Sequence, residues 1–369
     1  MGGGWRRWEA RGGGRRGGNC CAVAVVVAEA EVACGDEAVR YGEDLSQWLR
    51  LQGHCPCNGA VAAAATPPYW WRCDGYDGVR RRRRRMVSIS GSTGGSKLPT
   101  GDLNLLEFPL NLEYLEAEFF LWGAFGYGLD KLAPNLSSNG PSPVGAKAAK
   151  LSPLVKDIIA QFGYQEVGHL RAIKKTVPGF PRPLLNLSTE AFASVVNDAF
   201  GKALNPAFDP YANDINYLIA SYLVPYVGLT GYVGANAKLS SQTAKRLVAG
   251  LLGVESGQDA VLRTLLYEHA KEEVAPYGIT VAEFTNRFSD LRNNLGNKGF
   301  IKDEGLIVKE REGAEGKISG NILAGDEYSV AYDRSPEEIL RIVYGSGEER
   351  KPGGFFPKGA HGKIAESYL

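Results

Sequence analysis

The sequence predicts an all-α fold: a four-helix bundle with one long crossover, an added fifth helix and a mostly irregular C-terminal wrap. Residues 98–295 carry apolar side chains at helical spacing. A proline-rich stretch over residues 177–211 separates two helix pairs, whereas a simple up-and-down bundle uses short loops throughout. Glu166 and His169 lie one helical turn apart in an apolar helix, a spacing that carboxylate-bridged metal bundles use.

The composition of the chain changes at about residue 97. Residues 1–97 carry 15 basic and 9 acidic side chains and all six cysteines, whereas the remainder carries 27 basic and 32 acidic side chains. This leader shows no sustained helical or strand period, so we expect it to be mostly disordered. We expect a helical bundle over residues 98–296 and an extension over residues 297–369 that packs on that bundle.

Two segments of the leader suggest specific roles. Residues 20–33 form a short apolar run after an arginine-rich start, which resembles a secretory signal peptide and is too short to span a bilayer. Arg80–Arg85 is an unbroken arginine run without the interleaved aromatic side chains that nucleic-acid binding favours. We therefore expect no specific nucleic-acid binding, and we expect no membrane span because every other apolar stretch is broken by polar residues.

The first predicted helix covers residues 103–125 and is apolar on nearly all sides. Such a helix is buried among others, so the acids within it require an explanation. Glu113 and Glu116 share one face, whereas Glu118 points elsewhere and is expected at the rim.

The remaining helices are predicted from their start and stop signals. Ser152 and Pro153 form an N-cap and first turn, and Pro178 ends the helix that carries Glu166 and His169. Pro225 is expected to kink the third bundle helix, because proline removes a backbone donor. Further helices are predicted over residues 188–200, 213–235, 241–271, 280–295 and 335–344.

The candidate metal ligands come from three of the four bundle helices. A dinuclear iron or manganese bundle needs about six ligands, mostly carboxylates, with a histidine for each ion. Gln258 occupies the second histidine position, where a neutral amide is a poorer ligand, and the third helix has Pro225 where a glutamate is expected. We therefore expect no certain cofactor, and at most one Fe, Mn or Zn ion at a degenerate centre. The candidates are Glu113, Glu116, Glu166, His169, Glu255 and Gln258.

Two interpretations of these acids remain open. Buried carboxylates without partners cost several kcal/mol each, so they must meet a metal ion, His169 or one another through shared protons. A lone Glu/His pair is more often a hydrogen-bonded core pair than a ligand set. The acids therefore predict either a residual metal site or a metal-free polar core.

Several long segments resemble the plant desiccation-related proteins, which are assigned to the ferritin-like superfamily. The resemblance covers roughly residues 103–362 and is carried by LLEFPLNLEYLEAEFFLWGAFGYGLD, FGYQEVGHLRAI, PYANDINYLIASYLVPYVGLTGYVGA, LLGVESGQDAVLRTLLYE and GGFFPKGAHG. It implies a ferritin-like fold, expression under dehydration or other abiotic stress, and export through the secretory pathway to the cell wall. Bacterial ferritin-like relatives keep both Glu-x-x-His pairs, and this sequence departs from them at Gln258 and Pro225.

The sequence therefore favours a non-catalytic, stress-associated ferritin-like protein with a degenerate carboxylate/histidine metal centre. The alternative is a metal-binding protein or weak oxidase that uses Glu166, His169, Glu255 and a glutamate of the first helix. The sequence identifies no partner, although a homo-oligomer is compatible with it.

Overall fold

The computed structural model describes residues 98–369, so the expectations for residues 1–97 lie outside it. The all-α prediction is confirmed, since the described residues are mainly helical with one two-residue strand pair, β1 (Glu273–Val274) and β2 (Ile279–Thr280). The helices are α1 (Thr100–Glu107), α2 (Leu110–Phe125), α3 (Leu129–Leu132), α4 (Pro134–Ser137), α5 (Pro153–Thr176), α6 (Thr189–Phe200), α7 (Asp214–Ser221), α8 (Pro225–Asn236), α9 (Gln242–Glu268), α10 (Val281–Asn297), α11 (Pro336–Tyr344) and α12 (Lys363–Glu366), with 3₁₀ turns η2 (Glu310–Glu312) and η3 (Ala314–Gly316).

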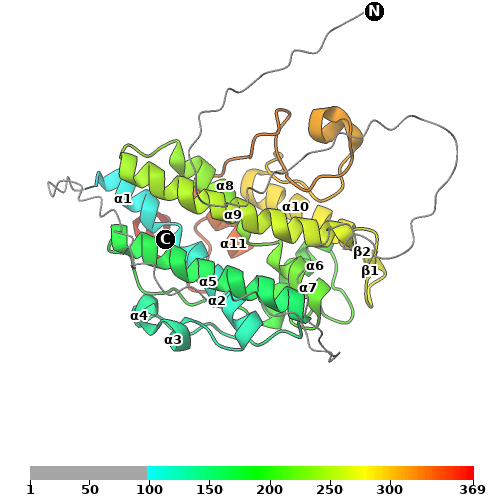
Figure 1. The fold of residues 1–369 in the computed structure, drawn as a ribbon, viewed down its shortest axis with the longest axis horizontal. Coiled ribbons are helices and arrows are strands. Elements are labelled where there is room, and N and C mark those ends of the chain that lie inside the picture. Colours follow the sequence, from blue (N-terminus) through cyan, green and yellow to red (C-terminus); the bar gives the residue numbers. More distant parts are fainter. Residues whose placement is uncertain (1–97) are drawn as a thin grey trace, which may run out of the picture. The chain divides into compact units, whose positions relative to one another are not determined.

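The bundle consists of two packed helix pairs, α2 with α5 and α8 with α9. Figure 1 shows α5 and α9 crossing the view next to each other, with α10 behind α9. The crossover between the pairs contains α6, as expected, and α10 packs against α6 and α11. Helix α2 buries 14 of its 16 residues, because other elements surround it on all sides.

The helix starts follow the local signals. The side chains of Ser152, Ser188, Thr280 and Ser335 accept hydrogen bonds from backbone N–H groups in the first turns of α5, α6, α10 and α11. Each of these side chains satisfies an N–H group that has no partner within its helix. These four elements therefore begin where the sequence predicts.

Two expected helices are interrupted. The first breaks at Phe108 and Pro109 into α1 and α2, and the third ends at Ser221 and restarts at Pro225 as α8. Both restarts have proline at or next to the first helical position, where its missing N–H costs nothing. The expected kink at Pro225 is thus a full break.

The expectation that Glu118 lies at the rim is wrong. Its side chain is fully buried and pairs with the buried guanidinium of Arg182, which also bonds Asp130 at 2.9 Å. A buried carboxylate needs such a partner to offset its lost hydration. This ion pair fixes the crossover segment to α2.

The segment Asp214–Asn236, which spans α7 and α8, is long and apolar enough to cross a membrane by length and composition. In the structure, 89% of that window is buried inside the bundle. A buried core helix meets the same length and composition criterion, so the absence of a membrane span stays a prediction.

Candidate metal centre

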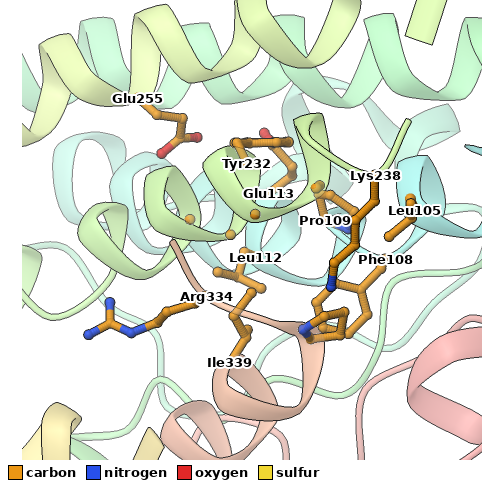
Figure 2. A pocket seen from close by; sticks show the side chains of 15 residues that line it. Leu105, Phe108, Pro109, Leu112, Glu113, Tyr232, Lys238, Glu255, Arg334 and Ile339 are labelled. Atoms are coloured by element: carbon orange, nitrogen blue, oxygen red, sulfur yellow. The ribbon is translucent and has the colours of Figure 1, made fainter. Parts of the chain in front are cut away.

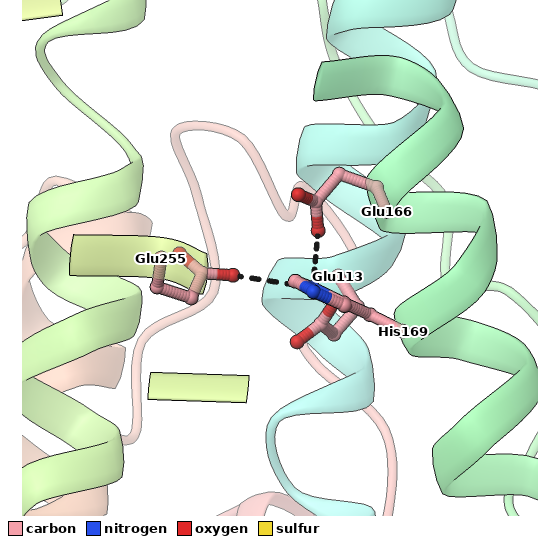
Figure 3. A group of neighbouring side chains, drawn as sticks. All are labelled: Glu113, Glu166, His169 and Glu255. Carbon is pink, nitrogen blue, oxygen red and sulfur yellow. Dashed lines mark hydrogen bonds and ion pairs between the residues drawn. The ribbon is translucent and has the colours of Figure 1, made fainter. Parts of the chain in front are cut away.

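Four of the predicted ligands converge in the middle of the bundle. Glu113 comes from α2, Glu166 and His169 from consecutive turns of α5, and Glu255 from α9. One ligand atom of each lies within 4.8 Å of the others, and all four residues are buried (Figure 3). The helical spacing of Glu166 and His169 therefore does bring both side chains to one point.

The ring nitrogen Nδ1 of His169 lies at the centre of this group. It is 3.1 Å from Glu113 Oε2, 3.2 Å from Glu166 Oε2 and 3.7 Å from Glu255 Oε1. One Nδ1 atom carries at most one proton, so it cannot donate good hydrogen bonds to three carboxylates. The geometry leaves negative charge without enough donors to compensate it.

These separations fit a shared metal ion. Ligand atoms about 2.1 Å from one ion stand about 3.0 Å apart at neighbouring octahedral positions and about 3.4 Å apart at tetrahedral ones. Two of the distances from His169 Nδ1, 3.1 and 3.2 Å, lie within that range, and the third, 3.7 Å, is slightly longer. The donor set, three carboxylates and one imidazole, suits Fe, Mn or Zn.

Without an ion, the four groups perturb one another strongly. Burial lowers the pKa of His169, but the neighbouring carboxylates, Glu113 first, raise it well above its usual value. Burial also raises the pKa of Glu166 well above its ordinary value and that of Glu255 to about 7. Burial would raise the pKa of Glu113 too, but His169 holds it below its usual value. The group of four side chains thus favours positive charge at its centre.

Glu116 lies beside this group and next to Glu255. It is 1% exposed, and neither carboxylate oxygen has a hydrogen-bond partner among residues 98–369. Glu116 Oε1 lies 3.3 Å from the point where a Cβ on Gly228 would stand, and Glu255 Oε2 lies 3.1 Å from the same point. Burial, followed by the charges of Glu255 and other neighbouring acids, raises the pKa of Glu116 well above its usual value. The structure therefore favours a protonated Glu116 at the edge of the site.

Gln258 lies next to the converging ligands and bonds one of them. Its Nε2 donates to Glu166 Oε1 at 2.6 Å and to Gln165 Oε1 at 3.1 Å. The amide oxygen, Oε1, is the atom of glutamine that can ligate an ion, and it is buried with no hydrogen-bond partner among residues 98–369. Gln258 thus holds the carboxylate of Glu166, and its role as a ligand stays a prediction.

Sequence reasoning missed Tyr232. Its hydroxyl donates to Glu113 Oε1 from α8, the helix without a carboxylate ligand. The other tyrosines of this segment lie elsewhere: Tyr222 bonds Ser289, and the ring of Tyr226 faces three arginines. The only available signal was the position of Tyr232 on the third bundle helix, two turns after Pro225.

The fold and this site define a ferritin-like helical bundle with a candidate carboxylate/histidine metal centre. A family model described as "Ferritin-like domain" matches residues 101–268. The chain belongs to the desiccation-related proteins of the ferritin-like superfamily. It is 62% identical over 266 residues to desiccation-related protein PCC13-62 of Craterostigma plantagineum, across 72% of this chain and 85% of that protein. It is also 56% identical over 268 residues to the ferritin-like catalase Nec2 of Nesocodon mauritianus, across 73% of this chain and 86% of that protein. No solved structure gives a significant match.

Proposed function

We propose that this protein binds one redox-active metal ion, iron or manganese, through Glu113, Glu166, His169 and Glu255. The observation that carries the proposal is the convergence of four buried donor atoms within 4.8 Å. Bringing three carboxylates together in a dry interior is expensive unless a cation compensates them. This favours the metal-binding alternative of the sequence analysis over the metal-free core.

We further propose that the bound ion serves the dismutation of hydrogen peroxide. The specific support is the relative of 56% identity that is named a ferritin-like catalase. Two molecules of peroxide give two of water and one of dioxygen: one is oxidised and releases two electrons and two protons, and the other takes them up as its O–O bond breaks. Such a reaction needs a redox couple, which iron or manganese supplies and zinc does not.

The residues around the ion have separate roles in this reaction. Glu113 is held by the hydroxyl of Tyr232, and Glu166 by the amide of Gln258, so both ligands are fixed before an ion binds. Glu116, with its raised pKa and unpaired oxygens, lies beside Glu255 and can hold and return a proton. The non-catalytic interpretation stays an untested prediction, and activity measurements decide between the two.

The experiment combines metal analysis with an oxygen assay on the full chain. Protein prepared with iron or manganese is expected to hold the ion in stoichiometric amount and to release dioxygen from hydrogen peroxide. Replacing the ligand His169→Gln is expected to remove both properties. His269→Gln is the matched control, because His269 ends α9 and pairs with Glu272 on a partly exposed surface. Bound metal without oxygen release would overturn catalysis alone, whereas wild-type protein that binds neither ion would overturn both proposals.

A further inference from the structure

We propose that a glycine-lined pocket between α2, α8 and α11 admits small uncharged molecules to the Glu113 and Glu255 side of the metal centre. This inference rests on the proposed metal site and adds the route and the class of ligand. We call this feature the access pocket. Figure 2 shows Glu113, Tyr232 and Glu255 at one end of it and Ile339 at the other.

The access pocket runs from the surface to the buried carboxylates. At its rim Leu105 and Ala235 are half-buried and Lys238 is exposed. At its base Glu113 and Glu255 are each 1% exposed. Oε2 of Glu255 lies 3.1 Å from the point where a Cβ on Gly228 would stand, so this carboxylate faces the inner end of the pocket.

Glycines of α8 create the space. Gly228, Gly231 and Gly234 lie three residues apart and therefore share one helix face, which lines the pocket. A Cβ on Gly228 would stand 3.1 Å from Glu255 Oε2, and one on Gly231 would stand 2.6 Å from Ile339 Cδ1. A side chain at residue 231 would thus overlap the end of Ile339 and force it to shift, which would crowd the pocket between α8 and α11.

Gly234 has a different reason to lack a side chain. A Cβ there would stand 2.3 Å from the backbone oxygen of Arg334, which is fixed in the tail. Gly234 is therefore required for close packing of backbone against backbone. Gly231 is the more informative position, because only the flexible end of Ile339 opposes it.

The walls select the class of ligand. Phe108, Leu112 and Ile339 supply apolar surface, and the cavity volume of about 20 Å³ is room for about one water-sized molecule. The guanidinium of Arg334 is already engaged by Thr230 at 3.0 Å and Asp303 at 2.9 Å. An anion would lose its hydration in this passage and then meet two carboxylates, which is unfavourable on both counts. Water, hydrogen peroxide, dioxygen and nitric oxide avoid that cost.

The test measures how fast nitric oxide reaches the ion in the full chain loaded with ferrous iron, by stopped-flow absorbance. Gly231→Val is expected to slow nitric oxide binding by about tenfold, the factor that ~1.4 kcal/mol of added barrier gives, with iron content unchanged. Gly253→Val is the matched control, since Gly253 lies on the exposed face of α9 with no atom within 4 Å of an added Cβ. Its rate is expected to equal that of the wild type.

A second variant narrows the pocket from the opposite wall. Ile339→Phe enlarges the side chain on α11 and is also expected to slow nitric oxide binding, so the test does not depend on whether Gly231→Val folds. Azide, a small anion, is expected to leave the absorbance of the ferric protein unchanged at pH 8. Wild-type nitric oxide rates in both narrowed, iron-loaded variants would overturn the route, and an azide spectrum in the wild type would overturn the ligand class. Loss of iron from the wild type would instead defeat the proposed metal site.

Discussion

Binding of a metal ion should stabilise the fold, and removing His169 should abolish that effect. A ligand that binds only the folded protein adds RT ln(1 + [L]/Kd), which is about 2.7 kcal/mol at a hundred times Kd. For a folded unit of this size each kcal/mol raises Tm by about 2 °C or more. We therefore expect saturating manganese or ferrous iron to raise Tm by roughly 5 °C, measured by calorimetry of the full chain.

The variant His169→Gln removes the only nitrogen ligand of the set. If the affinity falls about a hundredfold, the same metal concentration contributes only RT ln 2, or about 0.4 kcal/mol. The metal-free variant should also be less stable than the metal-free wild type by ~3 kcal/mol, because three buried carboxylates lose the cation that faces them.

The control variant His269→Gln should keep the full metal-dependent rise in Tm. The side chain of His269 is 37% exposed and pairs with Glu272, so its loss should change stability by less than about 1 kcal/mol. An equal rise in Tm for His169→Gln and the wild type would refute the assignment of His169 as a ligand.

Three further predictions concern the polar interior. Arg182→Met should lower the free energy of unfolding by about 3 to 5 kcal/mol in urea titrations, because it leaves Glu118 buried and unpaired; a loss below about 1 kcal/mol would contradict this account. Burial raises the pKa of Asp259 from 3.8 to about 6, so the ionised carboxylate destabilises the fold increasingly as pH rises through that range. Asp259→Asn should therefore raise the free energy of unfolding by about 3 kcal/mol at pH 8 but by little at pH 4, measured by urea titration at the two pH values. Arg263→Met should speed amide hydrogen exchange in residues 304–322 and leave α5 unchanged, because Arg263 donates to the carbonyls of Gly305 and Asn321.

The sequence predicted the features that depend on nearby residues. The caps at Ser152, Ser188, Thr280 and Ser335 determine helix starts through contacts three residues away. The Glu166 and His169 pair follows from helical geometry alone. That glutamates of α2 and α9 meet this pair could be inferred because unpaired buried acids in apolar helices need a common partner.

The features it did not predict depend on residues far apart in the chain. Glu118 finds its partner Arg182 in the crossover, 64 residues later. The hydroxyl of Tyr232 reaches Glu113 across 119 residues. Helical periodicity shows which side of a helix is buried, but it does not show which distant polar group that side meets. Whether Pro225 bends or breaks a helix also depends on packing around it.

The third bundle helix contributes to the candidate metal centre although it supplies no ligand. Counted as a source of ligands it is deficient, because α8 carries no carboxylate. In the structure the same segment supplies Tyr232 to orient Glu113 and glycines that open the access pocket toward Glu255. Structural metal sites are closed by protein ligands, whereas catalytic sites keep a position open. Four ligands on three helices would close a tetrahedral ion, but they would leave a five- or six-coordinate iron or manganese ion a free position. The apolar approach along the fourth helix leads to that side, so the missing carboxylate of α8 is compatible with a reactive site.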